Sequence, residues 1–561
     1  MSVGASTVSL GALLLVLLPL DPVVGTPALA LQGGGIRALA SDAGLVAGVA
    51  RIKHLQHLRQ LGQSSDVQAD LNSWDLTAVL KQFHMVSSVS GSSWFAAELF
   101  FSSSFLDLLA GIASSPSKSA QKFEKGWIGP WLRATGVTEP EFDSWQTLVR
   151  LWVKFWLGTG DEDTIFLAQF FLATGLSWNH FVDVLLNSTA GISSDAKMGS
   201  LPAFPTHQVW LVDHTLLLPS GGACISEGKL LLPHVRYKAE TGTDLPIYLP
   251  AAFSIKLGAG LHSVAPVSYM ALPEVPIKFN FEGVWLGGSS SKSSSPMFVD
   301  ATNGSLMNTS GQLPIARTVA ASSAFFGSAI DSVLLSEISA QLSADVAVWV
   351  GETGFEAAEH IREELQSHVD SQAISQLAQI AFHALLDGGF TDGTGVAQAV
   401  AAGSSEVVAV LNSFSSNQPE YVAQLFPGGT VIKPGVPKEL FPVFQSPNAS
   451  TVQASFEHFE TLQIAAGSMY LKVLAIGTID AVTADNAFFG ITRGRAIKIQ
   501  VINICSELSI GLFANFAHYS NLVEEIVLTI SDPANQDAVL TKLMPLFDSS
   551  FDSRPHMVRF V

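Results

Sequence analysis

The sequence feature that most constrains the fold is a short apolar run that ends at three glycines and leads into a helical pattern. Ala28 to Leu31 (ALAL) has the length and composition of a buried parallel strand, and Gly33, Gly34 and Gly35 follow it. From Gly44 to Leu61, apolar residues recur at helical spacing with basic residues on the opposite face. This part of the chain therefore predicts a strand, a glycine turn and a helix.

The same order recurs further along the chain. Phe83 to Val89 is an apolar-rich run, Ser90-Gly91-Ser92 is a turn of small residues, and Trp94 to Phe101 has a helical pattern. Tyr470 to Ile504 alternates apolar runs with turn-like sequences and predicts late strands. Repeated strand–turn–helix units favour parallel pairing, so we expect an α/β fold with a central, mostly parallel sheet flanked by helices.

Composition limits the classes of function. Hydrophobic residues make up 48% of the 561 residues and charged residues 14%, so the chain can bury a large core. The formal net charge of −19 repels phosphate groups, which argues against nucleic acid and anionic bilayers as partners and leaves zwitterionic lipid open. The two cysteines, Cys224 and Cys505, provide no disulfide framework, and we favour two buried thiols over a single disulfide.

Ser90 is a candidate nucleophile. Ester hydrolysis by a side chain requires a nucleophile on a sharp strand-to-helix turn, a base, and main-chain donors that face the developing oxyanion. Ser88 to Ser92 (SVSGS) places a serine at such a turn, and the start of the following helix would favour negative charge there. A serine that only packs or begins a helix is the alternative interpretation.

Two further turns could complete such a site. The N–H groups of Gly33 to Gly35 could face the same crevice, and Arg37 could bind a phosphate as a planar bidentate donor. Asp387 follows the apolar run Ala384 to Leu386 and precedes two glycines, so its carboxylate could meet a serine hydroxyl at a strand end. The alternatives are a flexible glycine turn, an ion pair at a helix start and an ordinary Asp-Gly turn.

Read together and in this order, three motifs resemble a known family. LALQGGGIRA, SVSGSSW and LLDGGFTDGTGV are similar to the catalytic domain of cytosolic phospholipase A2, of lysophospholipases of the phospholipase B type and, more distantly, of patatin. Pro314 to Gly327 (PIARTVAASSAFFG) resembles the family stretch that leads toward the aspartate. The resemblance spans residues 27–530 and implies the patatin-like α/β fold.

The resemblance also implies roles for individual residues. Ser90 would be the nucleophile that forms an acyl-enzyme, and Asp387 would act on it directly as the base, without a histidine. Gly34 and Gly35 would donate the oxyanion N–H groups, and Arg37 would contact the lipid phosphate. The implied reaction is hydrolysis of fatty-acyl esters of phospholipids or lysophospholipids at a membrane or micelle surface. It implies no metal, no cofactor and no stable protein partner.

Two features depart from the family pattern. The first glycine of the nucleophile motif is Ser88 here, and the span from Gly35 to Ser90 is longer than is usual.

The predicted domain organisation has three parts. Residues 1–25 include Leu10–Leu20, an apolar run of signal-peptide length without basic residues before it, so a secreted protein and a cytoplasmic or membrane-peripheral one both stay open. Residues 27–530 would form the catalytic domain, with a helical and irregular cap or insertion over about 103–299. The seven tryptophans from Trp94 to Trp178 could form a lipid-facing surface, but core packing is the favoured explanation. Residues 531–561 would be a C-terminal extension.

Two other functions fit the same sequence. A conventional α/β-hydrolase triad would take its base from His458, His518 or His556. A non-catalytic lipid-binding protein could keep the fold without turnover.

Overall fold

The structure is a computed structural model, and the residues it describes cover most of the predicted catalytic domain. They are 27–61, 76–135, 178–218 without 199, 205 and 207, 225–226, 229–230, 247–257, 297–299, 306–308, 314–323, 384–414, 420–430, 441–508 without 487, 488 and 490, and 516–548. The predictions for residues 1–25, Cys224 and His556 lie outside these ranges.

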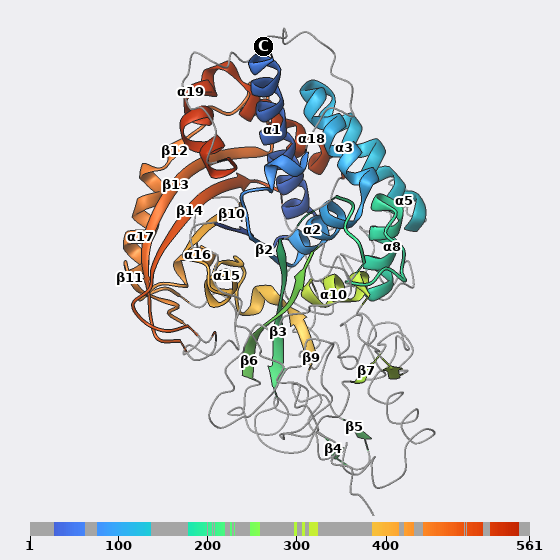
Figure 1. The fold of residues 1–561 in the computed structure, drawn as a ribbon, viewed down its shortest axis with the longest axis vertical. Helices are drawn as coiled ribbons and strands as arrows, with labels where there is room; N and C mark the ends of the chain where they lie inside the picture. Colours follow the sequence, from blue (N-terminus) through green and yellow to red (C-terminus); the bar gives the residue numbers. More distant parts are fainter. Residues whose placement is uncertain are drawn as a thin grey trace, which may run out of the picture.

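Ten strands form one sheet, and the main path through it is β11-β13-β14-β10-β1-β2-β3-β6, with β12 beside β13 and β9 beside β3 (Figure 1). Their bounds are β1 Ala28–Leu31, β2 Met85–Val89, β3 Val209–Leu218, β6 Ile247–Lys256, β9 Ala384–Asp387, β10 Glu406–Phe414, β11 Phe444–Ser446, β12 Glu460–Thr461, β13 Leu471–Thr483 and β14 Ala496–Ser506. Two small separate sheets pair β4 (Ile225–Ser226) with β5 (Lys229–Leu230) and β7 (Met297–Val299) with β8 (Leu306–Asn308).

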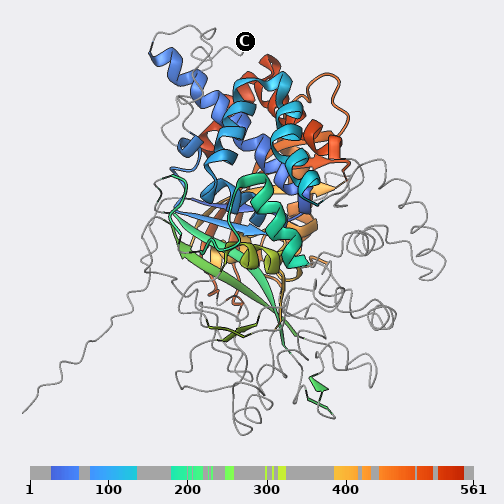
Figure 2. The same ribbon diagram turned by 90° about the vertical axis from the view of Figure 1, so that its right-hand side faces the viewer.

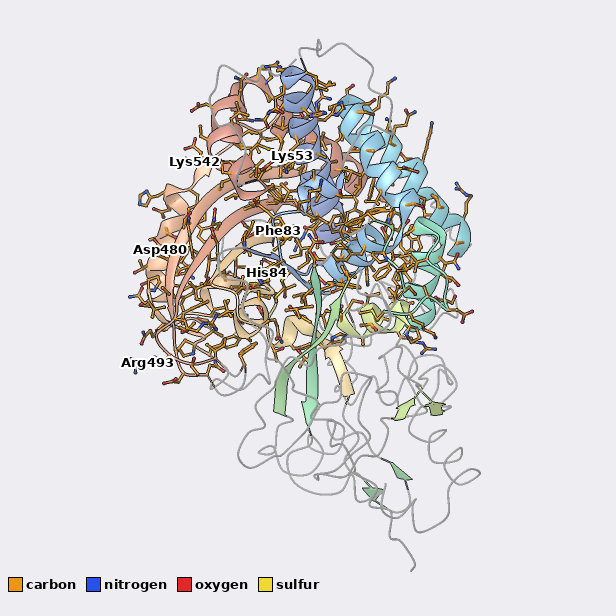
Figure 3. All side chains as sticks on the ribbon, in the orientation of Figure 1. Lys53, Phe83, His84, Asp480, Arg493 and Lys542 are labelled. Carbon is orange, nitrogen blue, oxygen red and sulfur yellow. The ribbon has the colours of Figure 1, made fainter. Side chains whose placement is uncertain are left out.

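The sheet is mixed, and the expectation of a mostly parallel sheet was wrong. The central strands β14, β10, β1, β2 and β3 pair in parallel, but β13 pairs antiparallel with β14, and β6 and β9 pair antiparallel with β3. Antiparallel neighbours need only a tight connection, whereas parallel neighbours need a crossover. Residues 484–495 join β13 to β14 without a crossover, and they include the turn sequence at Arg493, which is labelled in Figure 3.

The strand order reverses at β1. The chain passes from β1 to β2 and β3 on one side, and later returns as β10 on the other side of β1. The carboxyl ends of β1 and β2 therefore lie beside the reversal point, which is where α/β sheets form their ligand sites.

Helices cover both faces of the sheet. Leu29 and Leu31 of β1 belong to the core on one face, whereas Ala28 and Ala30 belong to the core on the other. The first face carries the larger helical layer, in which blue, cyan and red helices lie together (Figure 2). This layer contains α1 Gly35–Gln60, α2 Gly91–Phe101, α3 Ser103–Ser114, α4 Ser119–Phe123, α5 Gly129–Thr135, α8 Trp178–Ala190, α10 Ile315–Ser322 and α18 Phe516–Ser531, and the opposite layer contains α15 Val396–Ala401, α16 Glu420–Ala423 and α17 Ala449–Ser455.

The described part of residues 103–299 is built into this α/β body. It supplies β3 and β6 to the central sheet, and helices α3, α4, α5 and α8 to the larger core. Trp94, Trp127 and Trp131 are all buried, which confirms the core-packing interpretation for these three tryptophans. The expectation that residues 103–299 form a cap is therefore wrong for these strands and helices, which are part of the sheet and core.

The segment after α18 also belongs to the core up to Asp548. Leu540, Leu543 and Phe547 are buried there, and Phe547 meets Phe83 edge to face at 5.8 Å between ring centroids. Lys53 of α1 pairs with Asp548 at 3.2 Å. Both Phe83 and Lys53 are labelled in Figure 3. Residues 531–548 are thus a packed part of the domain.

No single helix among the described residues is long and apolar enough to cross a membrane. The helices α2 and α3 reach that length only together, and they are bent by 100° at the break between them.

Candidate active site

Ser90 lies at a strained turn between β2 and α2. Its φ of 56° and ψ of −128° make it the one non-glycine residue with positive φ in the described part of the chain. An L-residue adopts this conformation only where the surrounding structure enforces it, and such strain is found at the nucleophile turns of hydrolases. The strand β2 and the helix α2 thus hold the Ser90 side chain at the apex, as the sequence predicts.

The glycine turn after β1 lies directly against this apex. A Cβ on Gly33 would come within 2.8 Å of the Ser90 Cβ, and a Cβ on Gly91 would come within 2.1 Å of the Gly35 carbonyl oxygen. Gly34 has a φ of 146°, which also favours glycine. The missing side chains let the two turns meet.

The N–H groups of Gly34 and Gly35 are available as oxyanion donors. Neither has a hydrogen-bond partner among the described residues, whereas the N–H of Gly33 donates to the Gly393 carbonyl at 3.2 Å. Both groups lie at the start of the long helix α1, where the helix dipole favours negative charge. The turn therefore offers two donors beside Ser90, in the place that the sequence predicts.

Ser90 and Asp387 form the predicted pair. The Ser90 hydroxyl donates to Asp387 Oδ2 at 2.9 Å, and the Gly389 N–H donates to Oδ1 of the same carboxylate at 2.7 Å. Asp387 ends β9 and is 2% exposed. A Cβ on Gly388 would come within 2.5 Å of the Asp213 carbonyl oxygen, so glycine is needed there for packing, and the Gly389 N–H helps to orient the carboxylate.

Ser322 of α10 supports the apex and has no role assigned from the sequence. Its hydroxyl accepts the Ser90 N–H at 3.2 Å and donates to the Asp213 carbonyl at 2.7 Å. It belongs to the stretch from Pro314 to Gly327 in which the resemblance was noted. Nothing in the Ser- and Ala-rich sequence of this helix predicts that Ser322 would contact Ser90.

The Arg37 guanidinium is buried against the main chain. It donates from Nη1 to the Leu508 carbonyl and from Nη2 to the Asn412 carbonyl, both at 3.1 Å. A Cβ on Gly34 would lie 3.2 Å from its Nη2, so the guanidinium borders the glycine turn. These contacts tie the start of α1 to β10 and to the chain after β14. Phosphate binding by Arg37 stays a prediction.

Tyr421 of α16 borders the segment that follows Asp387, and the sequence did not predict it. Its ring packs on Gly393, where a Cβ would lie 2.6 Å from Cδ1. Burial raises the pKa of its hydroxyl, the charge of Arg37 lowers it and the charge of Asp387 raises it, so the phenol lies near both groups.

Two buried carboxyl groups lie beneath the site. Asp213 Oδ2 accepts a hydrogen bond from Ser87 at 2.8 Å, and Asp392 accepts from Thr394. Burial raises the pKa of both, and the Asp392 charge raises the pKa of Asp213 further. The two acids therefore favour a state in which Asp213 is neutral.

The candidate triad histidines are not joined to Ser90 in the described structure. His458 is exposed in the turn Phe456–His458, and His518 stacks on Tyr470 with 4.5 Å between ring centroids. His214 lies opposite Asp387 in the β3–β9 pairing, but its ring nitrogens lie 2.7 Å from the Val212 carbonyl and 2.9 Å from the Thr318 carbonyl.

Ser88, where the resembled motif has a glycine, is accommodated in the strand without a positive φ. It lies in β2, and its hydroxyl accepts a hydrogen bond from Trp210 Nε1 at 2.9 Å and lies 3.1 Å from the Ser93 hydroxyl. The buried Ser88 hydroxyl therefore fills the space that a glycine would leave empty, and its hydrogen-bonding groups have partners there.

No protein-family model matches this chain, and comparison with curated proteins finds no match.

Proposed function

We propose that this protein hydrolyses fatty-acyl ester bonds of phospholipids or lysophospholipids through a Ser90–Asp387 dyad. The observation that carries the proposal is the 2.9 Å hydrogen bond from the strained Ser90 to Asp387 Oδ2. A serine and a base within hydrogen-bond reach, beside unpaired main-chain donors, is the arrangement required for nucleophilic acyl transfer.

The first half of the proposed reaction forms an acyl-enzyme. Asp387 Oδ2 accepts the Ser90 proton while Oγ attacks the ester carbonyl carbon, and the N–H groups of Gly34 and Gly35 stabilise the oxyanion. The bond to the alcohol then breaks, and Asp387 returns the proton to the departing alkoxide.

The second half releases the fatty acid. Asp387 accepts a proton from a water molecule, which attacks the acyl carbonyl. The bond between the acyl carbon and Ser90 Oγ then breaks, and Oγ takes the proton from Asp387. The dyad is restored and the fatty acid is released.

The substrate class is supported by the motif resemblance and by charge. A net charge of −19 disfavours anionic surfaces, so phosphatidylcholine and lysophosphatidylcholine, which are zwitterionic, are the first substrates to test.

The test measures fatty acid release from mixed phosphatidylcholine and lysophosphatidylcholine micelles. Wild type and a His458→Ala/His518→Ala/His556→Ala variant should both be active, and Ser90→Ala should be inactive. Loss of activity in the folded histidine variant would favour a triad. No release by the wild type would favour another ester or a lipid-binding protein.

A further inference from the structure

Behind the site, a buried hydroxyl joins the two turns that meet at Ser90. Ser92 Oγ lies 2.7 Å from the carbonyl oxygen of Gln32, the residue before the glycine turn, and 2.6 Å from Asp42 Oδ2. Asn412 Nδ2 donates to the same Gln32 carbonyl at 3.0 Å. All four residues are buried. They link β1, α1, the start of α2 and β10.

Each of the two short distances from Ser92 Oγ, to the Gln32 carbonyl oxygen and to Asp42 Oδ2, requires a proton between the two oxygens. A hydroxyl has a single proton to donate, and a carbonyl oxygen can only accept. The Ser92 proton therefore lies toward Gln32, and the bond between Ser92 and Asp42 needs a proton from the carboxyl group. An ionised Asp42 would leave one of the two oxygen pairs in contact without a proton between them.

We propose that Asp42 is a neutral carboxylic acid in the folded protein and acts as a positioning residue for Ser90. In this form it donates to Ser92, which donates to Gln32, and the chain of bonds holds the oxyanion turn against the nucleophile turn. This role rests on the proposed function, whereas the protonation state of Asp42 does not.

The surroundings of Asp42 favour the neutral acid. Burial raises its pKa to about 8 and outweighs the effect of the nearby polar side chains of Ser92 and Asn412. These two polar side chains face the carboxyl from α2 and β10, and no charged side chain contributes to the shift. Arg37, on the same helix, is directed to the Leu508 and Asn412 carbonyls.

The first test is thermal unfolding of the wild type and Asp42→Asn as a function of pH. The folded pKa of about 8 lies above the ordinary value of 3.8, so the folded state keeps a proton that the unfolded state loses. Wild-type stability should therefore decrease from pH 4 to 8 relative to the variant, whose amide can donate to Ser92 without titrating. A difference in Tm that does not change over this range would overturn the proposal.

The second test is the rate of Ser90 labelling by a fluorophosphonate as a function of pH. The wild-type rate should decrease above about pH 8 as Asp42 ionises, by about tenfold per pH unit, and Asp42→Asn should keep its rate. The same alkaline decrease in Asp42→Asn and wild type would contradict the positioning role.

Glu98→Gln is the matched control. Burial raises the pKa of Glu98 to about 8 as well, and its carboxyl contacts Trp127 and Thr189, away from Ser90. This variant should change the pH dependence of stability and keep the wild-type alkaline decrease in labelling. Loss of that decrease in Glu98→Gln would mean that Glu98, and not Asp42, causes it, which would contradict the proposal.

If Asp42→Asn does not fold, Ser92→Ala decides the question. It breaks the link between Asp42 and Gln32, so labelling should be slower at every pH and should lose the alkaline decrease, and an unchanged alkaline decrease would overturn the proposal. If no variant is labelled or hydrolyses lipid at any pH, the proposed function fails, and the unfolding comparison still decides the state of Asp42.

Discussion

The carbonyl oxygen of Gly35 lies against the Cα of Gly91, so close that a Cβ on Gly91 would come within 2.1 Å of it. This contact joins the first residue of α1 to the first residue of α2. The proposed oxyanion donors and the proposed nucleophile are thereby held by two helix starts that touch each other.

Gly91→Ala should reduce both activity and stability. The added methyl group must push the two turns apart, and a displacement near 1 Å costs about 10²-fold in rate, with about 1–3 kcal/mol of overpacking. The measurements are ester hydrolysis and the free energy of unfolding. In Gly111→Ala, the control in α3, the new Cβ would lie 3.6 Å from its nearest neighbour, so that variant should lose neither.

Arg37→Lys should lower the unfolding free energy by about 1–3 kcal/mol, because a lysine cannot reproduce the hydrogen bonds to both Leu508 and Asn412. If Arg37 acts only through these carbonyls, hydrolysis of a phospholipid and of an ester without phosphate should decrease by the same factor. A decrease confined to the phospholipid would instead support phosphate binding.

Asp213→Asn should stabilise the protein increasingly as pH rises from about 4. The folded pKa of Asp213 is raised by burial and by Asp392, so the wild type loses stability as the unfolded state gives up its proton. Thermal unfolding at several pH values measures this. Asp480→Asn, which changes an exposed side chain on β13 (Figure 3), should stay within about 0.5 kcal/mol of wild type at each pH.

Ser90 and Asp387 could be predicted because each follows a short apolar strand and precedes glycines. The glycines are required because a side chain on Gly91 would clash with Gly35, and one on Gly388 would clash with Asp213. The packing of the site is therefore visible in the local sequence. The strands Ala28–Leu31 and Ala384–Asp387 were likewise predictable from their composition and the turns after them.

The remaining features depend on contacts between distant parts of the chain. The helix α1 begins at Gly35 rather than at Gly44, where the amphipathic pattern starts. Its residues from Ile36 to Ala43 are buried on every side, so they show no amphipathic period that would have predicted the earlier start. The antiparallel position of β9 beside β3 is a choice of partner that no local pattern specifies. Asp42 and Ser322 lie in helices that hold other polar residues, with no motif around them, so their contacts emerge only from the packed structure.

Fluorophosphonate labelling followed by peptide mapping tests the central claim most directly. The reagent should modify Ser90 in the wild type and label Asp387→Asn at least about 10²-fold more slowly, because the amide cannot take the serine proton. Ser194, which donates to Asp183 at 2.8 Å on the exposed surface, is an internal control that should not react. Modification of Ser90 that depends on Asp387 is the predicted result, and an unmodified Ser90, or equal labelling in Asp387→Asn, would contradict the dyad.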